Sequence, residues 1–211
     1  MHMRSSEIIH ILVAILIFFL VNSFSFIIKG SYTLLLQTFL FSIILISLAV
    51  FSKKAMAYSL DSNVEHEIWQ SSFELTPQRS AREYPAGVIL PILLSIITLG
   101  RLKFLSLLTY EARALKRRAS KRFGYYSYTE LTDWHNGLIG AVGIVSVFLL
   151  AIVAYIAGFE YFAKISTFYA FWNLIPISKL DGTQIFFGSK VLYSILAIVA
   201  LIFVSYSFFL V

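Results

Sequence analysis

The stretch GLIGAVGIVSVFLLAIVAYIAGFEYF, residues 137–162, decides the class of fold. It is longer than the roughly twenty apolar residues that a helix needs to cross the ~30 Å hydrocarbon core of a bilayer. Small residues recur along it, among them Gly140, Gly143 and Gly158. Such residues allow neighbouring membrane helices to approach one another closely. The stretch therefore predicts a transmembrane helix inside a bundle.

The composition of the whole chain agrees with a membrane protein. Of its 211 residues, 59% are hydrophobic and only 13% are charged, which excludes both a water-soluble fold and a disordered chain. Because there is no cysteine, the chain can form no disulfides, thiolate nucleophiles or cysteine zinc sites. The net charge of +6 reports membrane orientation, so the bilayer is an expected partner and nucleic acid is not.

The other segments predict an all-α polytopic membrane protein with about five to six transmembrane or re-entrant helices. Apolar runs at 8–28 and 33–51 predict a transmembrane hairpin whose second helix stops before Lys53 and Lys54. In chain order we expect an N-terminal transmembrane hairpin (1–51), a polar loop (52–84), a re-entrant or transmembrane segment (85–110), a basic cytoplasmic loop (111–136) and a C-terminal transmembrane core (137–211).

The segment 85–110 is interrupted by Pro91, Arg101 and Lys103, which leaves too few apolar residues for a straight crossing. The basic run within 111–122 marks the cytoplasmic side, since cytoplasmic loops carry an excess of Lys and Arg. A re-entrant hairpin keeps almost every basic cluster on that side, with Lys29 alone misplaced, whereas a full crossing does not. We therefore prefer the hairpin.

Chemistry is concentrated in FWNLIPISKLDG, residues 171–182, where Asn173 and Asp181 flank the helix-breaking Pro176. A proline in a membrane helix frees backbone groups that must find partners or line a cavity. An ionisable residue at such a break is a functional-site hypothesis by default. The alternative is an ordinary interfacial turn at Asp181 and Gly182.

This stretch resembles the Asn-x-x-Pro…Asp-Gly motif of the site-2 proteases, which are intramembrane zinc metalloproteases. The glycine-rich stretch 140–144 is similar to their Ala-Gly-Pro helix, with Ile144 in the place of the proline. The resemblance covers roughly residues 45–65 and 135–205 and implies a site-2-protease-like core. It places Asp181 at a zinc-ligand position and Asn173 beside the substrate. The implied substrate-binding cleft consists of Asn173, Pro176, Asp181 and Gly182.

The family's His-Glu-x-x-His motif is missing from the chain. The stretch AYSLDSNVE, residues 57–65, resembles the sequence that follows this motif in the family. Counting back from it places Ala49, Val50 and Lys53 where His, Glu and His would stand. We therefore expect no catalytic residues and no zinc or other cofactor. The resemblance then implies an inactive homologue that binds transmembrane segments of other membrane proteins.

Two alternatives stay open at this stage. The first is a divergent active zinc metalloprotease that uses Asp181 with His66 and His135 as weak further metal candidates. Against it, His66 lies in the predicted polar loop, where we expect a solvated or interfacial segment, and His135 follows Thr132 and Asp133, either of which can cap the next helix. The second alternative is a transporter or channel subunit, supported only by the break at Pro176.

Overall fold

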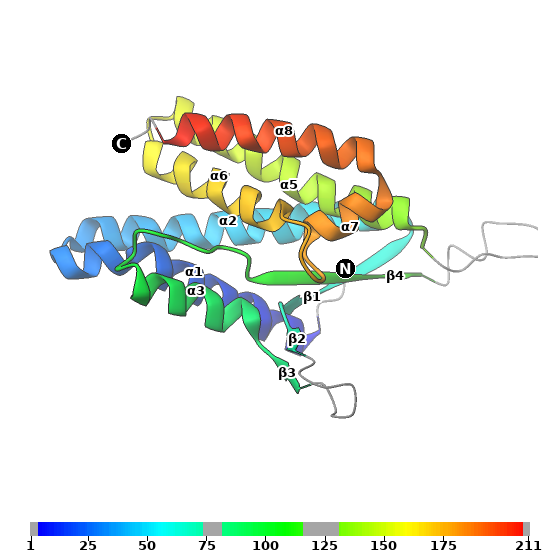
Figure 1. Ribbon diagram of the computed structural model, residues 1–211, viewed down its shortest axis with the longest axis horizontal. Helices are drawn as coiled ribbons and strands as arrows, with labels where there is room; N and C mark the ends of the chain where they lie inside the picture. The colour runs from blue at the N-terminus through cyan, green and yellow to red at the C-terminus, as the bar shows by residue number, and fades with distance from the viewer. Residues whose placement is uncertain (1–3, 74–81, 116–130, 209–211) are drawn as a thin grey trace, which may run out of the picture.

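The computed structural model describes residues 4–73, 82–115 and 131–208, and it is mostly helical. Figure 1 shows the long helices lying side by side along the long axis of the molecule. In chain order the elements are α1 (Ser5–Lys29), α2 (Tyr32–Ser59), β1 (Ser62–Ile68), β2 (Ser71–Phe73), β3 (Arg82–Tyr84), α3 (Ala86–Ile97), β4 (Leu108–Ala114), α5 (Asp133–Ile156), α6 (Glu160–Leu174), α7 (Asp181–Gly188) and α8 (Lys190–Ser207).

Four helices in the described part of the chain, α1, α2, α5 and α8, are long and apolar enough to cross a membrane. This confirms the expected membrane class, and the apolar helix α3 is shorter, with 12 residues. The main hydrophobic core lies between these helices and α6, and it includes Phe18, Leu45, Ile144 and Ile165.

Helix α2 is longer than the sequence predicted, and this corrects the boundary of the polar loop. It runs to Ser59, so Lys53 and Lys54 lie inside the helix. Its buried positions follow one another at steps of three and four residues from Thr38 to Ala57, which is the pattern of a single helix face. The two lysines lie on this inward face, and the apolar run alone could not reveal that.

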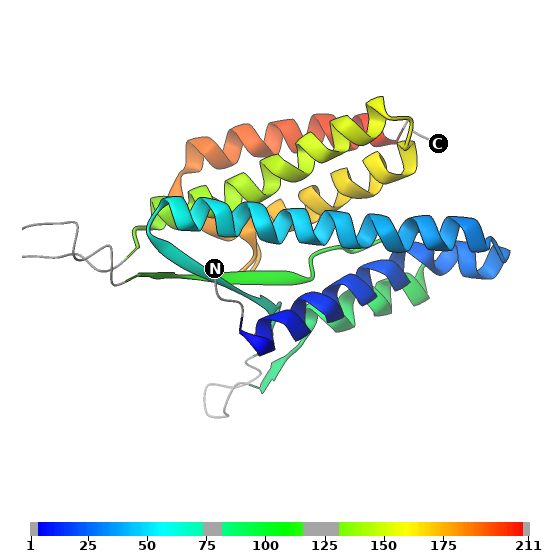
Figure 2. The ribbon, with the colours of Figure 1, turned by 180° about the vertical axis from the view of Figure 1, so that it is seen from behind.

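The expectation of an all-α fold is wrong in one respect, because the described residues include two small antiparallel sheets. Strand β1 pairs with β4, with His66 opposite Tyr110, and β2 pairs with β3. Alternate residues of β1 are buried, namely Ser62, Val64 and His66, as a strand packed on one face requires. Figure 2 shows β1 turning back beneath α2. Thus β1, β2 and β3 occupy much of the segment predicted as a polar loop.

The segment 85–108 has the form of a hairpin. Helix α3 leads away from β3, and the chain then returns without helical structure to β4 (Figure 1). At the base of the hairpin, the Trp69 N–H donates to the Leu107 carbonyl and the Gly87 N–H donates to the Trp69 carbonyl, both at 2.9 Å. Because β4 pairs with β1, the hairpin 85–108 begins and ends at the same end of this strand pair. β4 also takes residues 111–114 out of the predicted basic loop, most of which lies outside the described residues.

The helix break predicted at Pro176 is confirmed. Helix α6 ends at Leu174, and Ile175 has extended backbone angles of φ −64° and ψ 129°. A short exposed segment then leads to α7, which begins at Asp181. The predicted N-cap of α5 is also confirmed, since the Thr132 side chain accepts a hydrogen bond from the backbone N–H of His135.

Candidate functional site

Two inward-facing lysines of α2 form the centre of the candidate site. Lys53 and Lys54 are each 3% exposed, and they continue the buried stripe that contains Ala49 and Val50. A lysine ammonium in an apolar interior is costly unless a negative charge and hydrogen-bond acceptors surround it. Each lysine forms an ion pair with a buried carboxylate, and the two carboxylates come from different parts of the chain.

Lys53 pairs with Asp181. Its Nζ lies 2.5 Å from the Asp181 Oδ2, and both side chains are almost completely buried. Asp181 is the first residue of α7, so the positive end of the helix dipole also stabilises its negative charge. The pair links the inward face of α2 directly to the Asp-Gly end of the broken helix.

Tyr110 of β4 covers this ion pair. The Lys53 Nζ lies 4.9 Å from the centre of the Tyr110 ring, within the range of a cation–π interaction. The phenol donates a hydrogen bond of 2.6 Å to the Asn136 carbonyl, and Gln184 of α7 donates one of 3.0 Å to the Tyr110 carbonyl. Tyr110 is therefore fixed between α5 and α7, above the ammonium.

Glycines provide the space for these contacts. A Cβ atom at Gly143 of α5 would lie 2.5 Å from the Lys53 Cε, and one at Gly140 would lie 2.8 Å from the Tyr110 hydroxyl. A Cβ atom at Gly182 would clash with the Leu174 carbonyl. Gly143 and Gly140, which were predicted to allow close helix packing, thus make room for the lysine and the tyrosine, and Gly182 makes room for the start of α7.

Lys54 belongs to a second buried cluster with Glu7 of α1 and His66 of β1. The Lys54 Nζ lies 2.7 Å from Glu7 Oε1 and donates a 3.1 Å hydrogen bond to the Val64 carbonyl. Glu7 Oε1 also accepts from the backbone N–H of His66 at 3.0 Å, and it lies 3.1 Å from His66 Nδ1. Because a carboxylate only accepts, Nδ1 carries the imidazole proton. The carboxylate thus joins α1, α2 and β1.

The burial of His66 corrects the expectation of a solvated or interfacial segment, because its side chain is 1% exposed. Burial lowers the pKa of His66 to about 4; the hydrogen bond to Glu7 opposes this shift, and the nearby Lys53 ammonium adds to it. His66 is therefore neutral at pH 7. Two ammonium groups and two carboxylates then balance one another, so the buried polar network has no net charge.

The residues of the implied substrate-binding cleft do not form an open cleft in this structure. Asn173, Asp181 and Gly182 are buried, whereas Pro176 is exposed. The Asn173 side-chain amide donates 2.8 Å to the Tyr169 carbonyl of its own helix. Its Oδ1 is buried and accepts no hydrogen bond from the described residues. Among the described residues, Asn173 thus has one acceptor without a partner near the end of α6, and this acceptor is covered from solvent.

The three weak metal candidates do not come together. Within the described residues, no group of three or more His, Asp or Glu side chains could hold a metal ion. His66 is bound to Glu7, Asp181 is bound to Lys53, and the His135 ring contacts Thr132 at the start of α5. The structure instead brings together Lys53 and Asp181, the two positions that the resemblance assigns to a single metal.

Sequence reasoning missed Glu7, Lys54 and Tyr110 as members of the site. Glu7 stands at the edge of an apolar run and looks like an ordinary helix-end charge. A usable signal was the continuation of the α2 periodicity beyond Phe51, which places Lys53 and Lys54 in the same stripe as Ala49, Val50 and Ala57. Comparison of the chain with protein-family models, curated proteins and solved structures found no match.

Proposed function

We propose that the chain is a catalytically inactive relative of the site-2 proteases, in which a lysine–aspartate ion pair replaces the zinc site. We also propose that it holds transmembrane segments of partner membrane proteins. The observation that carries the first part is the contact between Lys53 and Asp181. In the resemblance, the second histidine of His-Glu-x-x-His and this aspartate bind the same metal, so the two positions must lie within a few ångströms of each other.

The chemistry of the pair also fits a replaced metal. A lysine is longer than a histidine by about one metal–nitrogen bond, which is ~2 Å, so its ammonium can reach the place of a histidine-bound cation. A single positive charge there still compensates the buried carboxylate of Asp181. With Ala49 and Val50 in the other two motif positions, the site has neither a second imidazole nor a general base.

The exposed break beside the site supports the binding role. Residues 176–179 are exposed and non-helical, with Ile177 49% exposed, and the buried Asn173 Oδ1 lies at the end of the preceding helix. A non-helical membrane segment has backbone groups that must find hydrogen-bond partners. An extended or partly unwound partner segment placed here would supply hydrogen-bond donors to the freed carbonyls. It would reach the Asn173 Oδ1 once the segment after α6 moves aside, because this atom is covered in the structure.

Photo-crosslinking tests the binding role. A photoreactive amino acid at Ile177 should capture membrane-protein partners, whereas one at Leu12, which is equally apolar and exposed on α1, should capture mainly lipid. Asn173→Ala should reduce the yield at Ile177 by about two- to tenfold, because it removes one hydrogen bond of ~0.5–1.5 kcal/mol. The same partners at both positions, or an unchanged yield in the variant, would argue against a binding site at the break.

The buried charge network favours one second candidate, a transporter or channel subunit. Ionisable residues inside membrane bundles often mark proton or ion pathways. If this were the function, Asp181→Asn would abolish a pH-gradient-driven flux in reconstituted vesicles. Under our proposal, vesicles that contain the unaltered chain show no flux beyond that of empty vesicles.

A further inference from the structure

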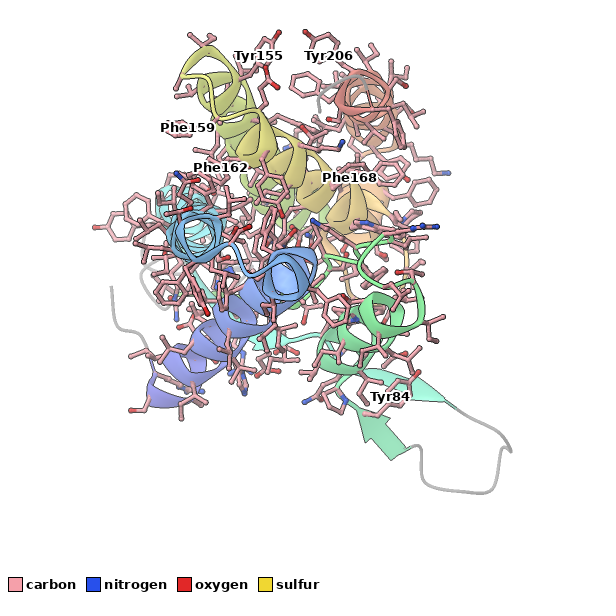
Figure 3. The ribbon with its side chains drawn as sticks, turned by 90° about the vertical axis from the view of Figure 1, so that its left-hand side faces the viewer. Tyr84, Tyr155, Phe159, Phe162, Phe168 and Tyr206 are labelled. Carbon is pink, nitrogen blue, oxygen red and sulfur yellow. The ribbon has the colours of Figure 1, made fainter. Side chains whose placement is uncertain are left out.

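A cavity of about 1420 Å³ lies far from the ion pair, at the opposite end of the bundle. It is lined by residues next to the α1–α2 turn, the end of α3, the α5–α6 turn and the end of α8. Along α2, Phe41 in its wall and Lys53 are separated by twelve residues, or about 18 Å of helix. Figure 3 looks onto this end, where Phe159, Phe162 and Phe168 project from the α5–α6 turn and α6. Neither Lys53 nor Asp181 lines the cavity, so it is separate from the ion pair, although its wall along α6 extends to Trp172, next to Asn173.

The walls of the cavity are apolar and run along the helices. On α6 the lining extends from Glu160 to Trp172 and includes Phe162, Ile165 and Phe168. At 1.5 Å per residue, this is about 18 Å, which is slightly more than half of the ~30 Å hydrocarbon core of a bilayer. The volume also exceeds the ~300–1,000 Å³ of ordinary small-molecule pockets. Length and volume both fit acyl chains from one membrane leaflet.

Basic side chains outnumber acidic ones in the lining of the cavity. Arg101, Lys103 and Lys164 line it together with one acid, Glu160. The Lys103 Nζ donates a 2.9 Å hydrogen bond to the Tyr161 hydroxyl, which donates one of 2.9 Å to the Asn22 carbonyl. Lys103 is close enough to Lys164 for the two ammonium groups to repel each other. Neither Arg101 nor Lys103 forms a salt bridge with a described residue.

We propose that this cavity binds an anionic phospholipid, with its acyl chains along α2 and α6 and its phosphate between Arg101 and Lys103. The charges argue for a lipid and against a partner helix. An apolar helix would fill the walls but leave these cations without a negative partner, whereas an anionic headgroup supplies the charge and its chains fill the walls. In addition, Arg101 and Lys103 lie at the end of the bundle opposite the predicted cytoplasmic end, so the expectation that Lys29 alone is misplaced is wrong. Basic residues are normally rare on that side of a membrane. A lipid ligand explains their position.

Native mass spectrometry of the purified full-length chain in detergent tests this proposal. Phosphatidylglycerol should bind, whereas phosphatidylcholine with the same acyl chains should bind much more weakly and inorganic phosphate alone should not bind. Arg101→Gln together with Lys103→Gln should weaken phosphatidylglycerol binding by about 25-fold, because each basic residue near an anionic headgroup contributes about fivefold. Gln at position 103 can still bond to Tyr161.

Two further variants separate the contribution of the basic residues in the cavity from that of its apolar walls. Lys190→Gln, which removes an exposed lysine at the start of α8, should leave the affinity unchanged. Leu34→Trp replaces an aliphatic side chain of the cavity wall with a bulky indole ring, so it should weaken the binding of both lipids to a similar extent. The melting temperature without lipid shows that each variant is folded. Equal binding of the two phospholipids, full affinity in the double variant, or a copurified protein that occupies the cavity would overturn the proposal.

Discussion

At the scale of single residues, the Lys53–Asp181 pair determines how the interior tolerates charge. Both groups are almost fully buried, so the loss of one leaves the other without compensation. Removing one partner of such a pair typically lowers the unfolding free energy by ~3–5 kcal/mol, whereas replacing both partners with apolar residues is often neutral or even stabilising. The pair is therefore expected to behave as a unit.

Lys53→Met or Asp181→Leu alone should each lower the unfolding free energy by ~3–5 kcal/mol, and the double substitution should recover most of that loss. The measurement is denaturation in detergent, followed by fluorescence. As a control, Arg113→Ala at the exposed Arg113–Glu111 pair should cost less than ~1 kcal/mol. Additive losses in the double variant would mean that the two side chains do not form a coupled pair.

His66 makes the stability of the fold depend on pH. Its pKa is about 4 in the folded chain against 6.5 for the free side chain, so the unfolded chain takes up the proton first as the pH falls. Stability from this residue is unchanged above pH 6.5 and is lost as the pH falls from 6.5 to 4. The loss amounts to ~3 kcal/mol, at about 1.4 kcal/mol per pKa unit.

His66→Gln should reduce this acid sensitivity, because glutamine keeps a donor for Glu7 but does not titrate. The experiment is a series of melting curves between pH 7.5 and 4 for both chains. The contribution of His66 is the difference between the two slopes, since the carboxylates titrate in both. Identical slopes would show that His66 is not buried in its neutral form.

The sequence could identify only some of the important residues. Asp181 and Asn173 are recognisable because they flank Pro176 within a few residues. Lys53 is recognisable through the spacing from Ala57 to Glu65. By contrast, Glu7 contacts a lysine 47 residues and a histidine 59 residues further along the chain, and no local pattern encodes such contacts.

At the scale of elements, the pairing of β1 with β4 explains the hairpin formed by 85–108. The paired residues run from Ser62 with Ala114 to Ile68 with Leu108. The chain between Ile68 and Leu108 must therefore leave this strand pair and return to it at the same end. Helix α3 has only 12 residues, or ~18 Å, and is too short to cross a ~30 Å core. We therefore expect a re-entrant segment.

Cysteine labelling tests this topology in a chain that has no native cysteine. Gln70→Cys before the hairpin and Glu111→Cys after it are both exposed positions and should react from the same side of the membrane. Phe159→Cys, at the α5–α6 turn, should react from the other side. Opposite reactivity of the first two positions would mean that the segment crosses the bilayer.

The positions of the long helices could be predicted because each needs only a long apolar run. The strands could not, although β1 has the alternating pattern of a half-buried strand, because its charged residues resemble a solvated loop. The partner strand is about 40 residues away and follows a helix. Only the tertiary fold reveals that these two segments pair and enclose His66 and Tyr110.

At the scale of the whole molecule, the two ends of the helical bundle differ in character. One end contains the buried, charge-balanced network around Lys53 and Lys54, and the other contains the apolar cavity with basic residues in its lining. The site-2-protease-like core that we propose concerns the first end. In this core, we propose, Lys53 occupies the position of a metal ligand opposite Asp181.

Zinc bound to a reconstructed site tests this claim most directly. In Ala49→His/Lys53→His, the new imidazoles lie four residues apart on the inward face of α2, and Asp181 becomes the third ligand. Elemental analysis of the purified variant should find about one zinc ion per chain, which the further change Asp181→Asn should remove, while the unaltered chain should hold none. Zinc in the unaltered chain, or a variant with no more zinc than the unaltered chain, would contradict the account.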